Sequence, residues 1–230
     1  AGAYSVPVAE HAWALILTLA KGTHSRLMDR GQYLNDPAYS PRQLTGRNLL
    51  VLGTGGIGGE VARIGKLAFS MHTIGINRSG RLAQYFDEVH PISELRGVLP
   101  RADVMVIALP LTKYTRGLLG ETELNLLPES AIVVNVARGD IVKEEDLYNV
   151  LTRRRGLRFA TDVFWDYGSG ESLSPRTGLL NLPNFIGTPH IAGGAQPDVA
   201  RNAIIMAVSN LVKYLKGEEA LNEVNRSDYV

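Results

Sequence analysis

A cluster of glycines that directly follows an apolar stretch constrains the fold of this chain more than any other feature. The apolar stretch is LLVL at residues 49–52, and the cluster is GTGGIG at residues 53–58. An apolar run without alternation is typical of a strand covered on both faces, as in parallel sheets. A helical pattern runs from about residue 57 to residue 69, so the glycines form a turn between a strand and a helix.

Strand-like and helix-like segments alternate along most of the remaining chain. Further strands are expected at 72–77, 88–90, 104–109, 131–136, 158–163 and 185–187, and helices at 93–98, 121–126 and 143–154. This β–α–β order predicts an α/β fold with a doubly wound parallel sheet and right-handed crossovers. A helix at 8–28 and a loop at 35–46 precede the sheet, and an amphipathic helix at 197–216 follows it.

The composition limits the partners that the chain can have. Lys and Arg total 24 against 23 Asp and Glu, a balance that offers no footprint for nucleic acid or an anionic membrane. The absence of cysteine excludes a disulfide scaffold, cysteine–zinc ligation and thiol catalysis, and we expect no metal site. The longest largely apolar run, 12–20, is shorter than the roughly 20 residues of a bilayer span. We therefore expect a soluble, cytoplasmic protein.

The glycine cluster matches G-x-G-x-x-G, which predicts a dinucleotide site when a strand precedes it and a helix follows. Gly53 permits the tight turn, Gly55 lets the pyrophosphate approach the backbone, and Gly58 allows the helix to pack closely on the strand. The free N–H groups of the first helical turn, at Gly56 and Ile57, attract the phosphates. We therefore expect a dinucleotide cofactor at this turn.

The end of the next strand bears on the choice between NADP and NAD. An NAD site usually places a carboxylate there, whereas this chain reads Asn77-Arg78-Ser79 and has no carboxylate before Asp87. An arginine and a hydroxyl can hold a 2′-phosphate by charge-assisted hydrogen bonds. We expect NADP to be preferred, with NAD as the alternative if Arg78 is only a solvated cation.

Three later strand ends carry polar residues that can do chemistry: Arg138, Asp162 and His190. Because ligands of open α/β sheets bind beyond the carboxyl ends of the strands, we expect these side chains to meet in one crevice. Taken singly, a loop arginine is usually solvated and a lone histidine is usually structural.

At these positions the sequence resembles the D-isomer-specific 2-hydroxyacid dehydrogenase family. The motifs occur in the family's order: SVPVAEH (5–11), GTGGIG, ALPLTKYTRGLL (108–119), VNVARGDIV (134–142), ATDVF (160–164) and NFIGTPHIAGG (184–194). The family includes phosphoglycerate dehydrogenase, glycerate dehydrogenase and glyoxylate/hydroxypyruvate reductase. The resemblance implies transfer of a hydride between a nicotinamide cofactor and a small 2-keto or 2-hydroxy acid.

The resemblance also implies a role for each polar residue. Arg138 would bind the substrate carboxylate and polarise the keto oxygen. His190 would give a proton to the carbonyl oxygen while the nicotinamide delivers a hydride to the carbon. Asp162 would hold the nicotinamide end of the cofactor. Cofactor-lining positions that the resemblance implies are Leu109, Pro110, Thr115, Val136, Ala137, Arg138, His190 and Gly193.

The glutamate that the family pairs with its histidine is not at its usual place. Five residues after Asp162 the chain has Tyr167, and no Glu-Pro pair follows. An insertion at 166–170 would bring Glu171 into this role, with Asp166 as the next candidate. A carboxylate there favours the imidazolium and orients the ring, so its loss would slow proton transfer or lower the pH optimum.

Family members begin with a substrate lobe, whereas this chain starts almost at the SVPVAEH helix. It is then either a fragment or a form without the lobe. We expect residues 1–193 to form a dinucleotide-binding domain with a leading interdomain helix, and 194–230 to belong to the substrate lobe. Without that lobe the last helix would expose an apolar face, which favours association. The helix at 8–28 matches the segment by which the family dimerises, so a homodimer is expected; a buried helix between lobes is the alternative.

The leading interpretation is an NADP-linked reductase of glyoxylate or hydroxypyruvate. The alternatives are a D-3-phosphoglycerate dehydrogenase and a non-catalytic NAD(P)-binding scaffold of the corepressor type. The absent lobe favours the scaffold for this chain, which alone could be inactive.

Overall fold

The computed structural model describes residues 2–25, 28–29, 32–33, 40–194, 197–221, 224 and 226–229. Its centre is a seven-stranded sheet, parallel throughout, with the order β5-β4-β3-β6-β7-β8-β9. The strands are β3 (Asn48–Leu52), β4 (His72–Asn77), β5 (Glu88–Pro91), β6 (Val104–Ile107), β7 (Ile132–Asn135), β8 (Arg158–Thr161) and β9 (Phe185–Gly187). Two short strands, β1 (Met28–Asp29) and β2 (Gln32–Tyr33), form a separate antiparallel pair. The expected doubly wound α/β fold is confirmed.

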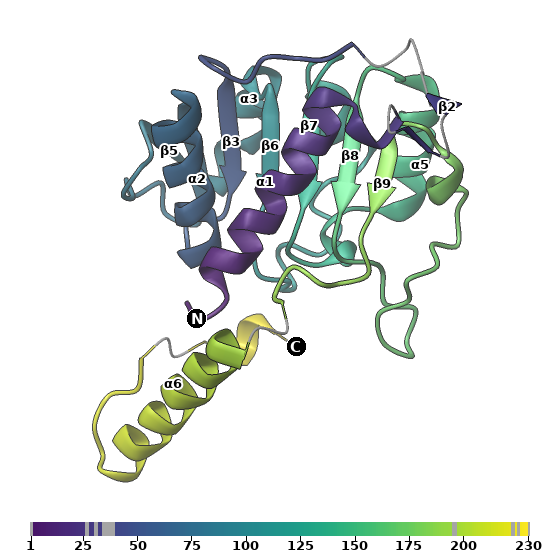
Figure 1. Cartoon of the computed structure of the whole chain (residues 1–230). Helices are drawn as coiled ribbons and strands as arrows, with labels where there is room; N and C mark the ends of the chain where they lie inside the picture. Colours follow the sequence, from purple (N-terminus) through teal and green to yellow (C-terminus); the bar gives the residue numbers. More distant parts are fainter. Residues whose placement is uncertain are drawn as a thin grey trace.

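Helices cover both faces of the sheet (Figure 1). They are α1 (Ser5–Lys21), α2 (Gly56–Phe69), α3 (Leu95–Val98), α4 (Glu121–Leu126) and α5 (Glu144–Arg153). A further helix, α6 (Pro197–Leu215), lies away from the sheet. Leu49 and Val51 of β3 pack into the cluster that contains α1 and α2, whereas Leu50 joins the cluster formed with α3, α4 and α5. Because successive side chains of a strand point to opposite faces, both faces of this strand must be apolar, which explains the unbroken run of the sequence.

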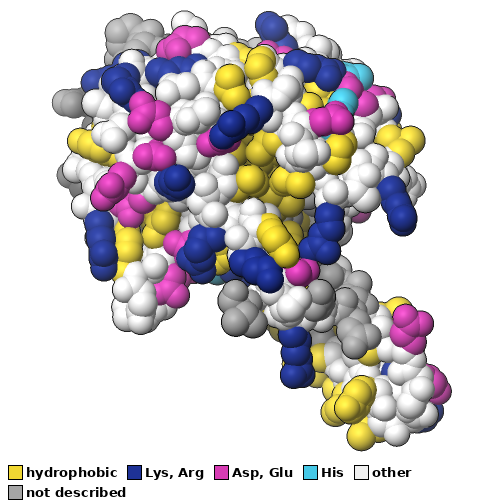
Figure 2. Space-filling view, turned by 180° about the vertical axis from the view of Figure 1, so that it is seen from behind, with side chains coloured by type: hydrophobic (Ala, Val, Ile, Leu, Met, Phe, Trp, Pro, Cys, Tyr) yellow, Lys and Arg dark blue, Asp and Glu magenta, His cyan; other side chains and the backbone are white. Residues whose placement is uncertain are grey.

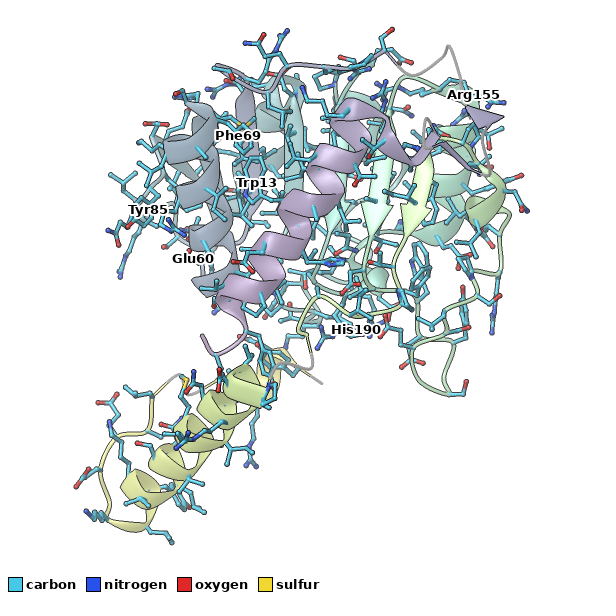
Figure 3. The ribbon with its side chains drawn as sticks, in the orientation of Figure 1. Trp13, Glu60, Phe69, Tyr85, Arg155 and His190 are labelled. Carbon is cyan, nitrogen blue, oxygen red and sulfur yellow. The ribbon has the colours of Figure 1, made fainter. Side chains whose placement is uncertain are left out.

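One tryptophan lies in each of these two layers. Trp13 of α1 stacks on Phe69 of α2 with ring centroids 4.6 Å apart, and its indole N–H donates to the carbonyl of Val61. Both residues are labelled in Figure 3. Trp165 belongs to the opposite cluster, and its indole N–H donates to the carbonyl of Val142 at 2.7 Å. Both layers are therefore packed around an aromatic ring whose polar atom is satisfied.

The first helix differs from the expectation at both ends. It begins at Ser5, so that Pro7 lies in its first turn, where the missing N–H costs nothing. The expected continuation to residue 28 is wrong: Gly22 adopts a left-handed conformation, with φ of 64°, and its N–H donates to Thr18. The expected loop at 35–46 falls partly outside the described residues, and residues 40–46 contain no helix or strand.

The last helix, α6, extends beyond the carboxyl edge of the sheet, as Figure 1 shows, and none of its residues is buried. Figure 2 shows apolar side chains at the surface of this protrusion. Ile204, Val208 and Leu211 are each more than half exposed. After α6 the chain turns at Gly217 and returns to the sheet, where the N–H of Lys113 donates to the carbonyl of Asp228 at 3.1 Å. Among the described helices, none is both long enough and apolar enough to span a membrane.

Candidate active site

Three glycines of the turn after β3 are closely packed, and the fourth faces open space. A Cβ on Gly56 would lie 2.3 Å from the hydroxyl oxygen of Ser5. Gly53 has φ of 103°, and a Cβ there would lie 2.6 Å from the carbonyl oxygen of Ala108. A Cβ on Gly58 would lie 1.8 Å from the carbonyl oxygen of Gly53. A Cβ on Gly55, at the N-terminal cap of α2, would have no neighbour within 4 Å. The turn therefore presents free backbone N–H groups to an open space, the arrangement that binds phosphates.

The end of β4 is tied to this turn by Asn77. Its side-chain amide donates to the hydroxyl of Thr54 at 3.0 Å, and its carbonyl oxygen accepts the N–H groups of Ser79 and Gly80. Arg78 points to a different partner: its guanidinium pairs with the carboxylate of Asp228 at 2.8 Å. Arg78 is thus not simply a solvated cation, although its side chain is 77% exposed.

Three adjoining cavities run along the carboxyl ends of the strands, with volumes of about 690, 700 and 640 Å³. Gly55, Leu109 and Pro110 line both the first and the second, and Ile57, Val136 and Arg138 line both the second and the third. The predicted cofactor residues that line this crevice are Gly53, Gly55, Gly56, Ile57, Asn77, Arg78, Leu109, Pro110, Thr115, Val136, Ala137, Arg138, Asp162, His190 and Gly193. Of the predicted set, Gly58 and Ser79 do not line it.

The structure brings Glu171 to His190. One carboxylate oxygen of Glu171 bonds to Nδ1 of His190, and the other accepts the N–H of Phe164. Because a carboxylate only accepts, the proton of this bond belongs to Nδ1, and Nε2 is the atom left for a substrate. Figure 3 shows His190 at the carboxyl edge of the sheet.

The other two candidate positions in this loop have different partners. Asp166 accepts the N–H groups of Gly168 and Gly170 at 2.7 and 3.0 Å, and it forms an isolated antiparallel bridge with Glu171. The hydroxyl of Tyr167 donates to Glu144. The segment 166–170 therefore loops out and closes on itself, which returns the chain to position for Glu171.

Asp162 holds the loop that carries the histidine. Its buried carboxylate accepts the hydroxyl of Thr188 at 2.6 Å and the N–H groups of Ile191 and Ala192 at 2.9 and 2.7 Å. His190, between these anchors, has φ of 52°, which a non-glycine residue adopts only when its surroundings impose it. The carboxylate that the sequence predicts at the cofactor thus also fixes the backbone of the proposed acid.

A second histidine, not predicted from the sequence, lies beside Asp162 and Thr188. Nε2 of His11 in α1 lies 2.9 Å from the hydroxyl of Thr188 and 3.4 Å from a carboxylate oxygen of Asp162. Since the hydroxyl of Thr188 donates to Asp162, it accepts from the imidazole. The signal in the sequence was His11 in the SVPVAEH motif, but only the packing of α1 over the sheet brings it to Asp162.

Arg138 follows β7 on a turn that a buried asparagine shapes. The side-chain amide of Asn135 donates to the carbonyl of Arg138, and its oxygen accepts the N–H of Ala137. The exposed side chain of Arg138 lines the same cavity as His190. Beneath the crevice, the hydroxyl of Thr115 donates to the carbonyl of Pro110 at 2.6 Å and accepts the N–H of Thr112, so it fixes this loop.

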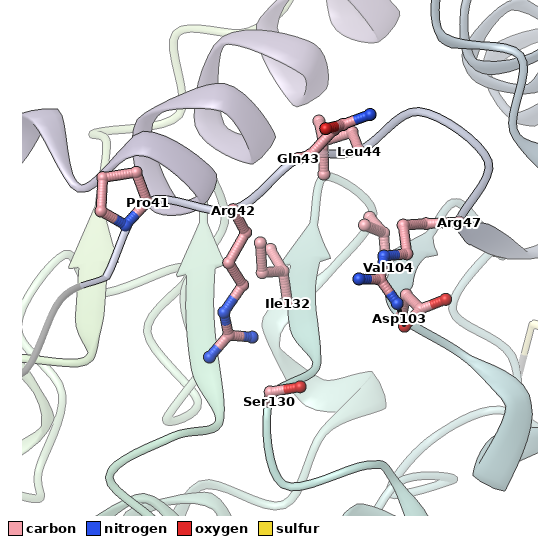
Figure 4. A pocket seen from close by; sticks show the side chains of 9 residues that line it. All are labelled: Pro41, Arg42, Gln43, Leu44, Arg47, Asp103, Val104, Ser130 and Ile132. Carbon is pink, nitrogen blue, oxygen red and sulfur yellow. Dashed lines mark ion pairs between the residues drawn. The ribbon is translucent and has the colours of Figure 1, made fainter.

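A smaller cavity of about 270 Å³ lies at the opposite edge of the sheet, where β6 and β7 begin (Figure 4). Arg42 and Arg47 line it, and Arg47 lies 3.9 Å from Asp103. Burial lowers the pKa of Arg42. The residues predicted from the sequence do not line this cavity. In the described part of the chain, no group of His, Asp and Glu is arranged to hold a metal.

Residues 13–192 match the family model of the NAD-binding domain of D-isomer specific 2-hydroxyacid dehydrogenases. The chain is 34% identical to a glyoxylate reductase from Aeropyrum pernix, over 98% of this chain and 68% of that protein. It is 32% identical to a D-3-phosphoglycerate dehydrogenase from Methanocaldococcus jannaschii, over 97% of this chain and 42% of that protein. A D-isomer specific 2-hydroxyacid dehydrogenase from Xanthobacter autotrophicus Py2, solved with NADPH and MES, superposes with a TM-score of 0.81 and 28% identity, covering 98% of this chain and 90% of that chain.

Proposed function

Because the chain belongs to the D-isomer specific 2-hydroxyacid dehydrogenase family, we propose that its crevice binds a nicotinamide dinucleotide and serves the reduction of a short 2-keto acid. One observation carries this proposal. At the far end of a crevice that begins at the glycine turn, Arg138 and His190 line one cavity, and Glu171 holds the imidazole. A cation for the carboxylate and a proton donor for the adjacent carbonyl oxygen are what this reduction requires.

In the proposed reaction Arg138, His190 and Glu171 have separate roles. Arg138 pairs with the substrate carboxylate and polarises the keto oxygen. His190 gives the proton on Nε2 to that oxygen, and Glu171 stabilises the imidazolium and fixes the ring through Nδ1. The nicotinamide, when bound, supplies the hydride to the carbonyl carbon. In the oxidative direction His190 takes the proton from the hydroxyl instead.

The residues present fit a dinucleotide along the crevice. The open space in front of Gly55 and the start of α2 suits a pyrophosphate. Arg78, which lines the crevice, supports NADP over NAD, with NAD as the alternative; Ser79 follows it in the sequence but does not line the crevice. Val136 and Ala137, beside Arg138 in the second cavity, offer an apolar wall for a nicotinamide.

The substrate, assembly and location complete the proposal. Relatives named glyoxylate reductase and glyoxylate/hydroxypyruvate reductase B support glyoxylate or hydroxypyruvate, and the match to a D-3-phosphoglycerate dehydrogenase supports phosphoglycerate as the second candidate. We place the end of the dinucleotide-binding domain at Gly193 and assign 194–230 to the substrate lobe. A homodimer in the cytoplasm is also part of the proposal.

The test is the absorbance of the reduced cofactor, followed with NADPH or NADH against glyoxylate, hydroxypyruvate and pyruvate, and in the oxidative direction with phosphoglycerate. It is run on this chain and on any longer native form. We expect turnover with NADPH that His190→Ala abolishes. Cofactor binding without turnover in both forms would favour the scaffold, and a clear preference for NADH would refute the assignment of Arg78 and Ser79.

A further inference from the structure

The end of the crevice next to β4 already holds a carboxylate, and it comes from the far end of the chain. Asp228 pairs with Arg78 at 2.8 Å across 150 positions of sequence. It lines the same cavity as Gly53 and Asn77, and its side chain is 12% exposed. The carboxylate that the sequence lacks at the end of β4 is therefore supplied by another segment.

We propose that Asp228 is a specificity-determining residue that competes with the 2′-phosphate of NADP for Arg78. The inference rests on the proposed function, because it needs a dinucleotide in the crevice. A 2′-phosphate at the guanidinium would lie close to the Asp228 carboxylate, and the two anions repel each other. A 2′-hydroxyl carries no charge and does not meet this repulsion. Asp228 thus lowers the affinity for NADP and spares that for NAD.

The segment that carries Asp228 is a short turn at the crevice. Residues 226–228 form a single 3-10 turn, of which Arg226 is exposed. Its bonds to the body of the protein include the ion pair with Arg78 and the backbone bond from Lys113 at 3.1 Å. The next residue, Tyr229, lines the cavity of Gly55 and Arg138, so the segment lies along the crevice rather than beside it.

The pairing also changes the guanidinium that a phosphate would meet. The hydrogen bond that Arg78 donates to Asp228 raises the pKa of the guanidinium. Because an arginine stays protonated without such a partner, Arg78 is charged whether or not the segment is in place. The competition therefore concerns access to a fixed positive charge and not its ionisation.

The experiment measures the affinities of the full 230-residue chain for 2′,5′-ADP and for 5′-AMP by calorimetry. In Asp228→Asn we expect the affinity for 2′,5′-ADP to rise by about fivefold, the equivalent of a strong exposed ion pair, and that for 5′-AMP not to rise. Asp198→Asn removes the same charge from the exposed start of α6 and should leave both affinities unchanged. In an Arg78→Gln background the Asp228→Asn effect should disappear.

Two results would overturn the inference. The first is that both nucleotides bind but Asp228→Asn does not raise the affinity for 2′,5′-ADP more than that for 5′-AMP. The competition is then refuted, while the dinucleotide site stands. If neither nucleotide binds to any variant, the proposed function falls and the inference falls with it. Retained binding of 5′-AMP shows in each variant that the protein is folded.

Discussion

Glu171 reaches His190 because of the residues that precede it, 166–170, and this explains why the sequence left two candidates open. Gly168 and Gly170 both adopt positive φ, of 93° and 96°, and the carboxylate of Asp166 accepts their N–H groups. The carboxylate of Asp166 therefore holds the loop, and Glu171 is the carboxylate that bonds to the imidazole. The spacing indicated an insertion, but only the backbone conformation of the two glycines decides which carboxylate it delivers.

Replacing Glu171 by Gln should lower kcat by about tenfold to a hundredfold, because the imidazolium loses its stabilising charge while the ring keeps a hydrogen-bond partner. Steady-state rates check this effect. The matched control is Glu145→Gln, on the exposed side of α5, which should leave the rate unchanged. An unaltered rate in Glu171→Gln would refute its assignment.

Asp162 should matter for folding as well as for the site. In Asp162→Ala the buried N–H of Ala192 and the part-buried N–H of Ile191 lose their acceptor, at a cost of about 2 kcal/mol in the free energy of unfolding. Asp162→Asn keeps one acceptor oxygen and should lose less. Urea unfolding of the two variants measures the difference. Equal stability of the Ala variant and the unmodified protein would show that the loop does not depend on this carboxylate.

The elements themselves were predictable where periodicity and packing agree. The bounds of β4, β9 and α4 match the sequence prediction, whereas the strand expected at 104–109 ends at Ile107. The apolar pattern continues to Leu109, because that side chain lines the crevice after the strand pairing has ended. Apolar residues that serve a ligand site look the same in sequence as residues of a strand, so such boundaries cannot be read from hydrophobicity.

The start of α2 offers a direct test of the glycine turn. Gly58→Ala should destabilise the protein by about 1–3 kcal/mol, because the new Cβ would overlap the carbonyl oxygen of Gly53. Gly59→Ala meets nothing within 4 Å and should be neutral or stabilise the helix by up to about 1 kcal/mol. Thermal unfolding of the pair checks both. Similar melting temperatures for the two variants would contradict the close approach of α2 to the turn.

The edge strand β5 should make stability depend on pH. Arg101, with His72 and His90, holds the pKa of Glu88 well below its ordinary value of 4.5. Glu88 and Glu94 raise the pKa of His90 above its ordinary 6.5. The contribution of Glu88 is present above pH 4.5 and lost as the pH falls, whereas that of His90 is present below pH 6.5 and lost as the pH rises.

These contributions overlap between the two ordinary values, so the strand is held best in mildly acidic solution. Relative to His90→Asn, the unmodified protein should be more stable by about 0.5 kcal/mol near pH 5.5, and the difference should shrink near pH 8.5. Denaturant unfolding of both proteins at the two pH values measures it. A difference that grows toward alkaline pH would contradict the assigned sign.

For the whole molecule, the long-range contacts are the part that the sequence could not predict. The motifs predicted the crevice and its residues, but the Asp228–Arg78 pair depends on the path of the chain after α6. The apolar side chains on α6, such as Ile204 and Val208, are exposed in the described structure. The chain spans 42% of the phosphoglycerate dehydrogenase that it matches, and the substrate lobe to which we assign α6 would cover this face.

The proposed homodimer gives a prediction about mass. Light scattering at micromolar concentration should report twice the 25.0 kDa of the single chain. Most apolar residues of α1, among them Trp13 and Ile16, are buried within this chain. A dimer through this region would therefore use the other side of the helix and the segment beyond it. A monomeric mass at that concentration would contradict the proposal.

The two tryptophans are intrinsic fluorescence probes of the two layers. Trp13 and Trp165 are both almost fully buried, and they lie on opposite faces of the sheet. Their fluorescence should therefore be blue-shifted in the native state and move to the red as either layer opens. Trp165 also adjoins Phe164, whose N–H binds Glu171, so its emission follows the surroundings of the proposed acid. In Trp165→Phe only Trp13 remains, so the fluorescence follows the layer that contains α1 and α2. A delay between the unfolding signals of this variant and of the unmodified protein would show which layer is lost first.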